Sequence, residues 1–591
     1  MERQRLLTNI LAIMVAVGLL AAVPLAAMAA RPAARQAIMD PALFPAVEQG
    51  DAVVAVIVQS EAGSKAAAAA VQRAGGEVTA ELWIINGVAA RVNGAALARL
   101  RADPAVSRIS RDIGVKVSGT LSDDEDEVNL LNLPALDVEA DWLHRHGITG
   151  KGITVAVVDT GIERKPHLKL HPPGSVDFVE PNGPRFRDPH GHGTLMAGII
   201  GSNWRDRRQG VRMGLAPDAR LVSVRVLDAN GQGAYSTVIQ GLQWVVENKS
   251  RFNIRVVNLS LHAEVVCPYF FDALDQAAEA VWRNGIVVVT AAGNTGPNPA
   301  TITAPGNDPY IITVGAVHTK DTPGDRSDDY IAPFSSSGPT LDNFVKPDVV
   351  APGVRVCSLL ASPNCTMAQQ YPDSIIGPRQ KAFKISGTSA SAAVTSGVVA
   401  LMLDKHPDTS PDVVKYRLMV TAWVGGNAEL GLFYSPLRQG CGYVNAKAAA
   451  LSTEVGTANS GLDPNAYCIG RADVLADDLI WANGDTWTGS QQLCWFTGDT
   501  WTGNLIWTGG DTWTGGVIWL GGQTWTGGDT WTGGDTWTGG DTWTGGDTWT
   551  GGDTWTGGDT WTGGDTWTGG DTWTGGDTWT GGNVYVSYIN L

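Results

Sequence analysis

From about residue 138 the chain alternates between continuous apolar runs and segments of helical character, and this alternation constrains the fold most strongly. A run that is apolar throughout is typical of a strand buried on both faces, as in a parallel sheet covered by helices. The sequence therefore predicts an α/β domain whose mainly parallel sheet has helices on both faces. The strands are expected over 153–158, 221–227, 256–261, 286–292 and 311–317, and helices between them include 236–248 and 270–284.

Three short motifs follow or open apolar runs in this domain, and together they supply an acid, a base and a hydroxyl nucleophile. They are Asp159-Thr160-Gly161, His192-Gly193-Thr194 and Ser386-Gly387-Thr388-Ser389. A serine hydroxyl needs an imidazole to accept its proton and a carboxylate to orient that imidazole. The carboxyl ends of the strands in an open α/β sheet form one edge, which places such side chains near one another. The order Asp, His, Ser therefore predicts a nucleophilic hydrolase.

Each motif taken alone has a simpler interpretation. Asp-Thr-Gly is also an ordinary turn, and Ser-Gly-Thr-Ser is also a polar turn that caps a helix. His190 precedes His192 by two residues, but a zinc site would need further ligands at suitable spacing, and none is nearby in the sequence. His192 is expected near the start of a helix, where the helix dipole disfavours a charged imidazole.

In this order the motifs resemble those of the subtilisin-like serine peptidases (subtilases, family S8) over about residues 130–450. The resemblance implies a subtilisin-like fold and hydrolysis of peptide bonds by a Ser-His-Asp triad, with no cofactor for catalysis, no catalytic metal, and structural calcium as an option. The family pattern of His-Gly-Thr followed by Ala197-Gly198 selects His192. The segment 291–294 resembles the part of these enzymes that stabilises the oxyanion.

The resemblance assigns a role to twelve residues. Residues 260–262 and 231–233 are implied as the two edges that bind an extended substrate, and 291–293 as a wall of the pocket for the substrate side chain before the cut. His262 stands where the family usually has Gly, and Ala393 where it usually has Pro. The expected catalytic residues are Asp159, His192 and Ser389, the oxyanion residue is Asn294, and the substrate-binding residues are Gly231, Gly233, Ser260, Leu261, His262, Ala291, Ala292 and Gly293.

Two segments are expected before the peptidase domain (130–452). Residues 1–29 have a basic start, an apolar run and an Ala-x-Ala ending, which predicts a signal peptide and hence secretion. An uncleaved membrane anchor is the alternative. Residues 30–120 are predicted to be an inhibitory propeptide, because 46–117 shows a strand, helix, two strands, helix, strand order typical of a ferredoxin-like α+β unit. The last strand of this order is expected as one extended run over 106–117. An unrelated small α/β domain is the alternative. Self-maturation is expected somewhere within 118–135.

The C-terminal region, 481–591, follows a linker at 453–480 and repeats Gly-Gly-Asp-Thr-Trp-Thr between Gly527 and Thr580. An even repeat suits strands, because alternate residues keep the same face. The region is expected to be either a β-solenoid or a disordered low-complexity stalk. It could contact the cell surface or a polymer.

The net charge and the cysteine content bear on nucleic-acid binding and on disulfide bonds. The net charge is −17, but 12 Asp and no Glu, Lys or Arg follow residue 481, which leaves −5 for the rest. The composition therefore does not indicate the excess of Lys and Arg that is typical of a nucleic-acid-binding surface.

Six Cys in an exported chain permit up to three disulfides, and Cys357–Cys365 and Cys468–Cys494 are the pairs suggested by proximity in the sequence.

The favoured function is a secreted or surface-attached serine endopeptidase (a hydrolase, EC 3.4.21) that cuts protein or peptide substrates and is inhibited by its own propeptide until that segment is removed. The alternative is a surface-display or binding protein with a degenerate protease domain, in which the Trp- and Thr-rich tail does the work. His262 and Ala393 favour this alternative slightly, whereas the complete triad and Asn294 favour the enzyme.

Overall fold

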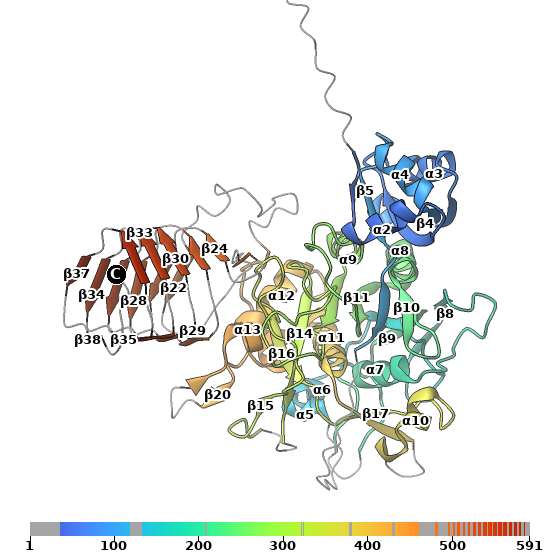
Figure 1. The fold of residues 1–591 in the computed structure, drawn as a ribbon. Helices are drawn as coiled ribbons and strands as arrows, with labels where there is room; N and C mark the ends of the chain where they lie inside the picture. Colours follow the sequence, from blue (N-terminus) through green and yellow to red (C-terminus); the bar gives the residue numbers. More distant parts are fainter. Residues whose placement is uncertain are drawn as a thin grey trace, which may run out of the picture. The chain divides into compact units, whose positions relative to one another are not determined.

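The computed structural model describes residues 36–118 and 133–459, apart from 207–209, 321, 323, 377–380 and 428–431. Beyond residue 459 it describes the backbone of strands between Leu479 and Tyr585. The chain forms two compact units, Met1–Arg111 and Asp112–Leu591 (Figure 1). The predicted signal peptide lies outside the described residues. In the parts that the structure covers, no helix is both long and apolar enough to cross a membrane.

Among its described residues, the first unit has one sheet and three α-helices, of which α2 (Phe44–Gln49) is the shortest. Strands β2 (Val53–Gln59), β3 (Glu77–Leu82), β4 (Gly87–Asn93) and β5 (Arg108–Arg111) join the short β1 (Ile38–Met39) in the order β1-β5-β2-β4-β3. Helix α3 (Ser64–Arg73) follows β2, and α4 (Gly94–Ala102) follows β4, where the Asn93 side chain accepts a hydrogen bond from Ala96 N. The core contains Val56, Val58, Ala67, Ala70, Val71, Leu97 and Leu100.

The second unit is built on an eight-stranded sheet, which confirms the α/β class with a mainly parallel sheet. Seven of its strands run in the order β15-β14-β13-β11-β7-β9-β8, with β16 beside β14, and only β15 pairs antiparallel. The five expected strands are all present, whereas β8, β15 and β16 were not predicted. The strands are β7 (Thr154–Asp159), β8 (Leu170–Asp177), β9 (Arg220–Arg225), β11 (Ile254–Leu259), β13 (Val287–Ala291), β14 (Ile312–His318), β15 (Tyr330–Ile331) and β16 (Val349–Pro352).

Helices cover both faces of this sheet. Ser396 of α11 (Thr388–Lys405) donates to Asn258, which stands beside Val157 in the β11–β7 register. Gly241 of α8 (Tyr235–Phe252) packs near the side chain of Val158. Because Val157 and Val158 point to opposite faces, α8 and α11 lie on opposite sides of the sheet. Helix α9 (Ala273–Arg283) packs with α8, and α7 (His192–Gly201) packs with α11.

A separate three-stranded sheet corrects one expectation from the sequence. The extended run expected over 106–117 is two strands in different sheets, because β5 ends at Arg111 and β6 (Gly114–Val117) pairs antiparallel with β10 (Gln232–Ala234) and β12 (Leu261–His262). The change of partner occurs at Asp112, whose carboxylate accepts hydrogen bonds from the backbone N and Oγ of Ser236 at the start of α8.

Apart from the repeat region, the rest of the described second unit consists of short elements, most of which follow β16. Cys357 lies in β17 (Val356–Leu359) and Cys365 precedes α10 (Thr366–Gln370), and both are buried free thiols, so the suggested Cys357–Cys365 pair is wrong. Burial raises the pKa of Cys357 to about 12. Cys468 and Cys494 lie outside the described residues. The remaining elements are α5 (Pro134–Asp137), α6 (Ala140–Arg145), β18 (Ile375–Ile376), β19 (Ala382–Ile385), α12 (Pro411–Val420), β20 (Gly426–Asn427), β21 (Leu432–Phe433), α13 (Pro436–Gln439) and α14 (Ala446–Leu451).

The repeat region contains short parallel strands stacked in register. Strand β28 (Thr524–Gly527) pairs with β31 (Thr542–Gly545), and β31 with β34 (Thr560–Gly563), so that each strand pairs with the strand three repeats later. The strands from β22 (Leu479–Ala482) to β38 (Val584–Tyr585) form three such sheets, with one antiparallel pair between β23 (Trp495–Phe496) and β24 (Thr500–Thr502).

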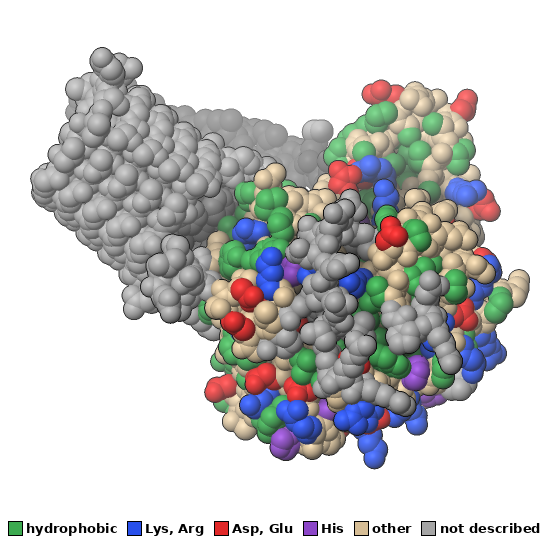
Figure 2. All heavy atoms as spheres, turned by 90° about the horizontal axis from the view of Figure 1, so that it is seen from below, with side chains coloured by type: hydrophobic (Ala, Val, Ile, Leu, Met, Phe, Trp, Pro, Cys, Tyr) green, Lys and Arg blue, Asp and Glu red, His purple; other side chains and the backbone are tan. Residues whose placement is uncertain are grey.

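Charged side chains of both signs are interspersed over the described surface that Figure 2 shows. That distribution agrees with the near balance of charge outside the repeat region.

Candidate active site

Two of the expected catalytic residues are in contact. Asp159 is the last residue of β7, and His192 is the first residue of α7. Both Asp159 oxygens lie 2.9 Å from His192 Nδ1, and neither side chain is exposed to solvent. A carboxylate at Nδ1 keeps the proton on that nitrogen, so Nε2 is left as the basic atom.

The motifs Asp159-Thr160-Gly161 and His192-Gly193-Thr194 can make this contact because glycine at position 193 lets their backbones approach closely. A Cβ atom on Gly193 would lie 2.1 Å from the Gly161 carbonyl oxygen and 3.2 Å from Asp159 Cβ. Only glycine therefore fits at position 193 without moving Asp159 away from His192.

Asp188 joins the two motifs and was not predicted from the sequence. Its Oδ1 accepts hydrogen bonds from Thr160 Oγ1 at 2.8 Å and Gly191 N at 2.7 Å. Its Oδ2 accepts from the N and Oγ1 of Thr194, at 2.8 and 2.6 Å. Burial raises the pKa of Asp188, although all four donors act in the opposite direction. The structural importance of Asp188 is evident from its burial and its four hydrogen-bond donors. A single Asp in a loop gives no such signal in the sequence.

Ser389 is the second residue of α11 and is fully buried. Gly387 precedes the helix with φ of 146°, in the region that favours glycine. Neither Ser389 Oγ nor His192 Nε2 forms a hydrogen bond with any residue that the structure describes. These are the two atoms that must exchange a proton in triad chemistry, and such bonds are often unformed before substrate is in its reacting position.

Asn294 lies just after β13 and is held by Thr388. Its Oδ1 accepts from Thr388 N at 2.9 Å and from Thr388 Oγ1 at 3.0 Å. The Nδ2 group of Asn294 donates to the Ser118 hydroxyl at 3.3 Å. Gly293 also contacts Thr388, through its N at 3.2 Å.

The two expected substrate edges lie on either side of β6. Gly231 O accepts from Val117 N at 3.0 Å, and Gly233 pairs with Val115. Leu261 pairs with Val117, and His262 with Lys116. The Ser260 hydroxyl, supported by Asn258, donates to Ser389 O at 3.0 Å. Ala291 pairs with Val314 within the sheet, and Ala292 O accepts from Thr303, so these two residues contact the sheet and its neighbouring loop.

Two further histidines lie close to the site. Burial and the neighbouring His192 lower the pKa of His190 to about 4, which leaves its ring neutral near pH 7. Burial lowers the pKa of His262, and the charges of Lys116 and His192 lower it further. Across the described parts of the chain, no group of three or more His, Cys, Asp or Glu side chains is arranged to hold a metal ion. Structural calcium therefore stays a prediction.

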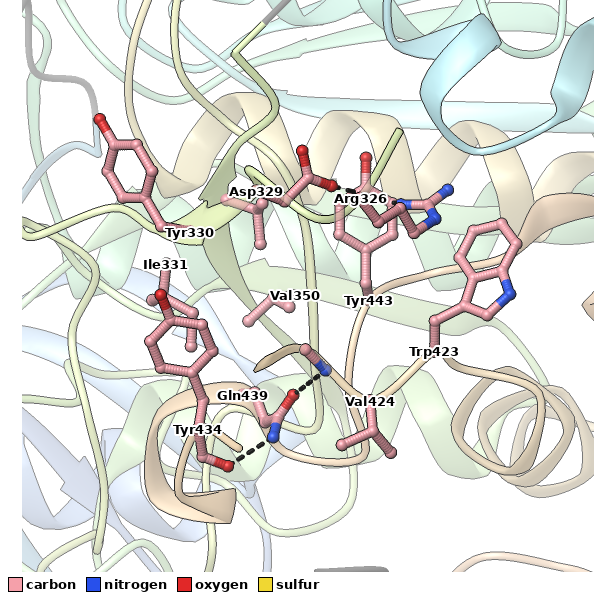
Figure 3. Close-up of a pocket in the computed structure, with 12 residues that line it drawn as sticks. Arg326, Asp329, Tyr330, Ile331, Val350, Trp423, Val424, Tyr434, Gln439 and Tyr443 are labelled. Carbon is pink, nitrogen blue, oxygen red and sulfur yellow. Dashed lines mark hydrogen bonds and ion pairs between the residues drawn. The ribbon is translucent and has the colours of Figure 1, made fainter. Parts of the chain in front are cut away.

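A hollow between β15, β16 and the segment 423–443 contains none of the expected site residues (Figure 3). The Arg326 guanidinium lies 3.6 Å from the Trp423 ring centroid and 4.0 Å from that of Tyr443. Gln439 bonds to Gly425 N and Tyr434 O on its other side. Ring stacking and hydrogen bonds to the backbone therefore shape this hollow, and none of the residues in these contacts belongs to the three catalytic motifs.

Comparison of the sequence with known proteins identifies a matching family and several relatives. The sequence model of the family described as "Peptidase_S8: Subtilase family" matches residues 150–457. Serine protease AprX of Bacillus subtilis is 39% identical over 277 residues, which are 46% of this chain and 61% of that protein. Subtilisin E of Bacillus subtilis is 32% identical over 378 residues, 64% of this chain and 84% of that protein.

A solved structure shows a similar fold. Fervidolysin from Fervidobacterium pennivorans, described as a keratinolytic enzyme related to subtilisin, superposes with a TM-score of 0.54 at 20% identity. The match covers 71% of this chain and 63% of fervidolysin.

Proposed function

The chain belongs to the subtilase family, a family of serine endopeptidases, and on that premise we propose that it hydrolyses peptide bonds with Ser389, His192 and Asp159 as its catalytic triad. The observation that carries the proposal is the contact of both Asp159 oxygens with His192 Nδ1, which leaves Nε2 as the one basic atom of the imidazole. Ser389 stands at the start of α11 with its hydroxyl buried and without a partner among the described residues.

The reaction proceeds through an acyl-enzyme. Ser389 Oγ attacks the substrate carbonyl carbon while His192 Nε2 takes the hydroxyl proton, and Asp159 stabilises the imidazolium. The backbone N of Ser389 and Nδ2 of Asn294 donate to the oxyanion that forms. His192 then gives its proton to the leaving amine, and a water molecule, activated by the same imidazole, releases the acyl product.

Protein or peptide substrates bind as an added strand between 231–233 and 260–262, the position that β6 occupies. Backbone hydrogen bonds from both edges hold the substrate in one register whatever its sequence. The preference of the enzyme for particular substrate side chains therefore comes from the pockets beside the strand.

The proposal also covers the segments outside the peptidase domain and the role of calcium. The chain is exported by its signal peptide, and residues 30–120 act as a propeptide that inhibits the enzyme and is then removed. Calcium, if bound, has a structural role, and the repeat tail contacts a surface or polymer. The match of the family to 150–457 does not favour a binding protein with a degenerate protease domain.

The test uses the purified full chain, a fluorogenic peptide or casein, and a serine-directed phosphonate. We expect hydrolysis and labelling of one serine in the parent chain, and neither in Ser389→Ala. The control is Ser374→Ala in the short turn 372–374, which should match the parent because this serine lies outside the catalytic machinery. Hydrolysis that is unchanged in Ser389→Ala would contradict the proposal.

A further inference from the structure

The start of α10 contacts residues 189–191, which we call the histidine loop because the proposed catalytic histidine follows them. Thr366 N donates a hydrogen bond to Pro189 O at 3.0 Å, and Met367 N donates to His190 O at 3.0 Å. The first N–H groups of a helix have no acceptor within the helix, so the loop carbonyls satisfy two donors of α10 that would otherwise lack a partner. The histidine loop and α10 therefore hold each other in place through their backbones.

The Cys365 side chain packs against the same loop. A Cβ atom on Gly191 would lie 2.7 Å from Cys365 Sγ, and Gly191 has a φ of 106°, in the region that favours glycine. Cys365, Thr366 and Met367 thus contact three consecutive residues of the histidine loop. None of these three residues belongs to a catalytic motif or has a role implied by the resemblance to subtilases.

The Thr366 hydroxyl also reaches one of the two proposed substrate edges. Its Oγ1 lies 2.8 Å from Ala229 O and 3.4 Å from Pro189 O, so it donates mainly to Ala229. Ala229 belongs to the turn 228–232, which leads into the proposed edge 231–233. A single side chain therefore joins the histidine loop to the edge that binds substrate in the proposed function.

The turn 228–232 is closed by hydrogen bonds among its own residues. These bonds are Asp228 N to Gln232 O at 2.8 Å, Gly231 N to Asp228 O at 3.1 Å, and Asn230 N and Gln232 N to Asp228 Oδ1 at 2.8 and 3.0 Å. They set the shape of the turn but not its position, because both partners in each bond move with the turn. Among the residues that the structure describes, and apart from β6, only the Thr366 hydroxyl forms a hydrogen bond with the turn from outside it.

We propose that Thr366 is a positioning residue of the peptidase, whose hydroxyl fixes the turn 228–232, and with it the substrate edge 231–233, relative to the histidine loop. This inference rests on the proposed function and adds to it a residue that places the substrate. In the proposed mechanism Thr366 neither exchanges a proton nor binds the oxyanion. Without its hydroxyl the substrate itself must order the turn, and that cost weakens binding and leaves the chemical step unchanged.

Thr366→Val tests the hydroxyl, because valine keeps the branched shape and leaves the backbone bonds to the histidine loop in place. The substrate is a peptide long enough to pair with the edge 231–233. We expect its KM to rise by about three- to tenfold, the effect of losing one neutral hydrogen bond, and kcat to stay within about twofold of the parent value. Thr366→Ser keeps the hydroxyl and should restore the parent KM.

A second measurement separates the edge from the triad. A small serine-directed phosphonate that carries no peptide should label the parent and Thr366→Val at equal rates, because such a reagent does not use the edge. The matched control is Thr421→Val. Thr421 is half-buried like Thr366, and its hydroxyl also donates to a backbone carbonyl, that of Arg417 at 2.6 Å, so this variant should keep the parent KM.

The outcomes separate this inference from the proposed function. If KM in Thr366→Val equals that of the parent, whatever its Tm, Thr366 does not position the edge. If kcat and the labelling rate fall together at unchanged KM, the hydroxyl acts on the histidine loop, which also overturns the inference. Thr366→Ala repeats the test without the added methyl group if Thr366→Val does not fold. A parent chain that is neither labelled nor able to cut the peptide contradicts the proposed function itself.

Discussion

Both carboxylate oxygens of Asp159 lie 2.9 Å from Nδ1 of His192, in a site from which solvent is excluded. A charge–dipole contact of this kind is stronger without water to screen it, and it orients the ring that accepts the Ser389 proton in the proposed mechanism.

Asp159→Asn should therefore lower kcat by about 10⁴-fold, because an amide can donate to Nδ1 and so stabilise the wrong tautomer. KM should change little, since Asp159 does not touch substrate. Steady-state kinetics on a fluorogenic peptide provide the measurement, with Asp373→Asn in the exposed turn 372–374 as the control. A variant that keeps parent-level kcat would show that Asp159 does not orient the base.

Asn294 can be tested with two substitutions that separate its two contacts. Asn294→Asp keeps an oxygen for Thr388 N but loses the Nδ2 donor, whereas Asn294→Ala loses both. We expect each variant to lower kcat by ~10²–10³-fold with KM nearly unchanged, because the donor acts on the oxyanion. If Asn294→Asp retained full kcat, the residue would serve only to hold Thr388.

Asp188 should behave as a positioning residue. Asp188→Ala leaves the buried N–H groups of Gly191 and Thr194 without acceptors, each at a cost of ~1–3 kcal/mol, and loosens the loop that carries His192. We expect a lower Tm and a reduced kcat at unchanged KM. Asp188→Asn keeps one acceptor and should recover part of kcat. A loss of Tm alone, with kcat intact in the folded fraction, would limit Asp188 to stability.

His262 should influence the substrate residue that takes the place of Lys116, which stands opposite His262 in the pairing of β6 with β12. Burial, Lys116 and His192 lower the pKa of His262, so its ring gains a proton only below its ordinary range. The ratio of kcat/KM for a peptide with Glu at that position to one with Lys should rise about two- to fivefold as the pH falls through that range, the size of a cross-strand charge pair. In His262→Gln the ratio should stay constant.

Glu279 should make the protein less stable at high pH. Burial raises the pKa of Glu279 to about 9, Asp308 adds to this, and the ion pair with Arg283 opposes it only partly. A carboxyl whose pKa is higher in the folded state stabilises the fold below its unfolded value, about 4.5, and this contribution is lost as the pH rises toward 9. Glu279→Gln should therefore flatten the fall in Tm between pH 5 and pH 9. Equal slopes in variant and parent would contradict the raised pKa.

The local structure of the peptidase unit follows closely from its sequence. The strand expected over 153–158 is observed over Thr154–Asp159, and the helix expected over 236–248 is part of Tyr235–Phe252. Ser410 caps the helix Pro411–Val420 by accepting from Val413 N, as Ser-Pro at a helix start predicts. These features depend on neighbours in the sequence.

Contacts between distant segments could not be predicted in the same way. Asp188 is an unremarkable loop residue until Thr160 and Thr194 are folded around it. Cys357 and Cys365 are close in sequence, but they are buried as free thiols in β17 and before α10. Spacing along the chain does not determine where either side chain points.

The sequence by itself determined the α/β class and the candidate chemistry, because hydrophobic period and residue type are local properties. The tertiary structure alone decided that the run over 106–117 divides at Asp112, that β6 lies between β10 and β12, and that Ser118 O accepts a hydrogen bond from Ser389 N. Any extended segment can satisfy its backbone hydrogen bonds with more than one sheet. Only the folded positions of Ser236, Gly231 and Ser260 select the partner, and they come from parts of the chain more than a hundred residues away.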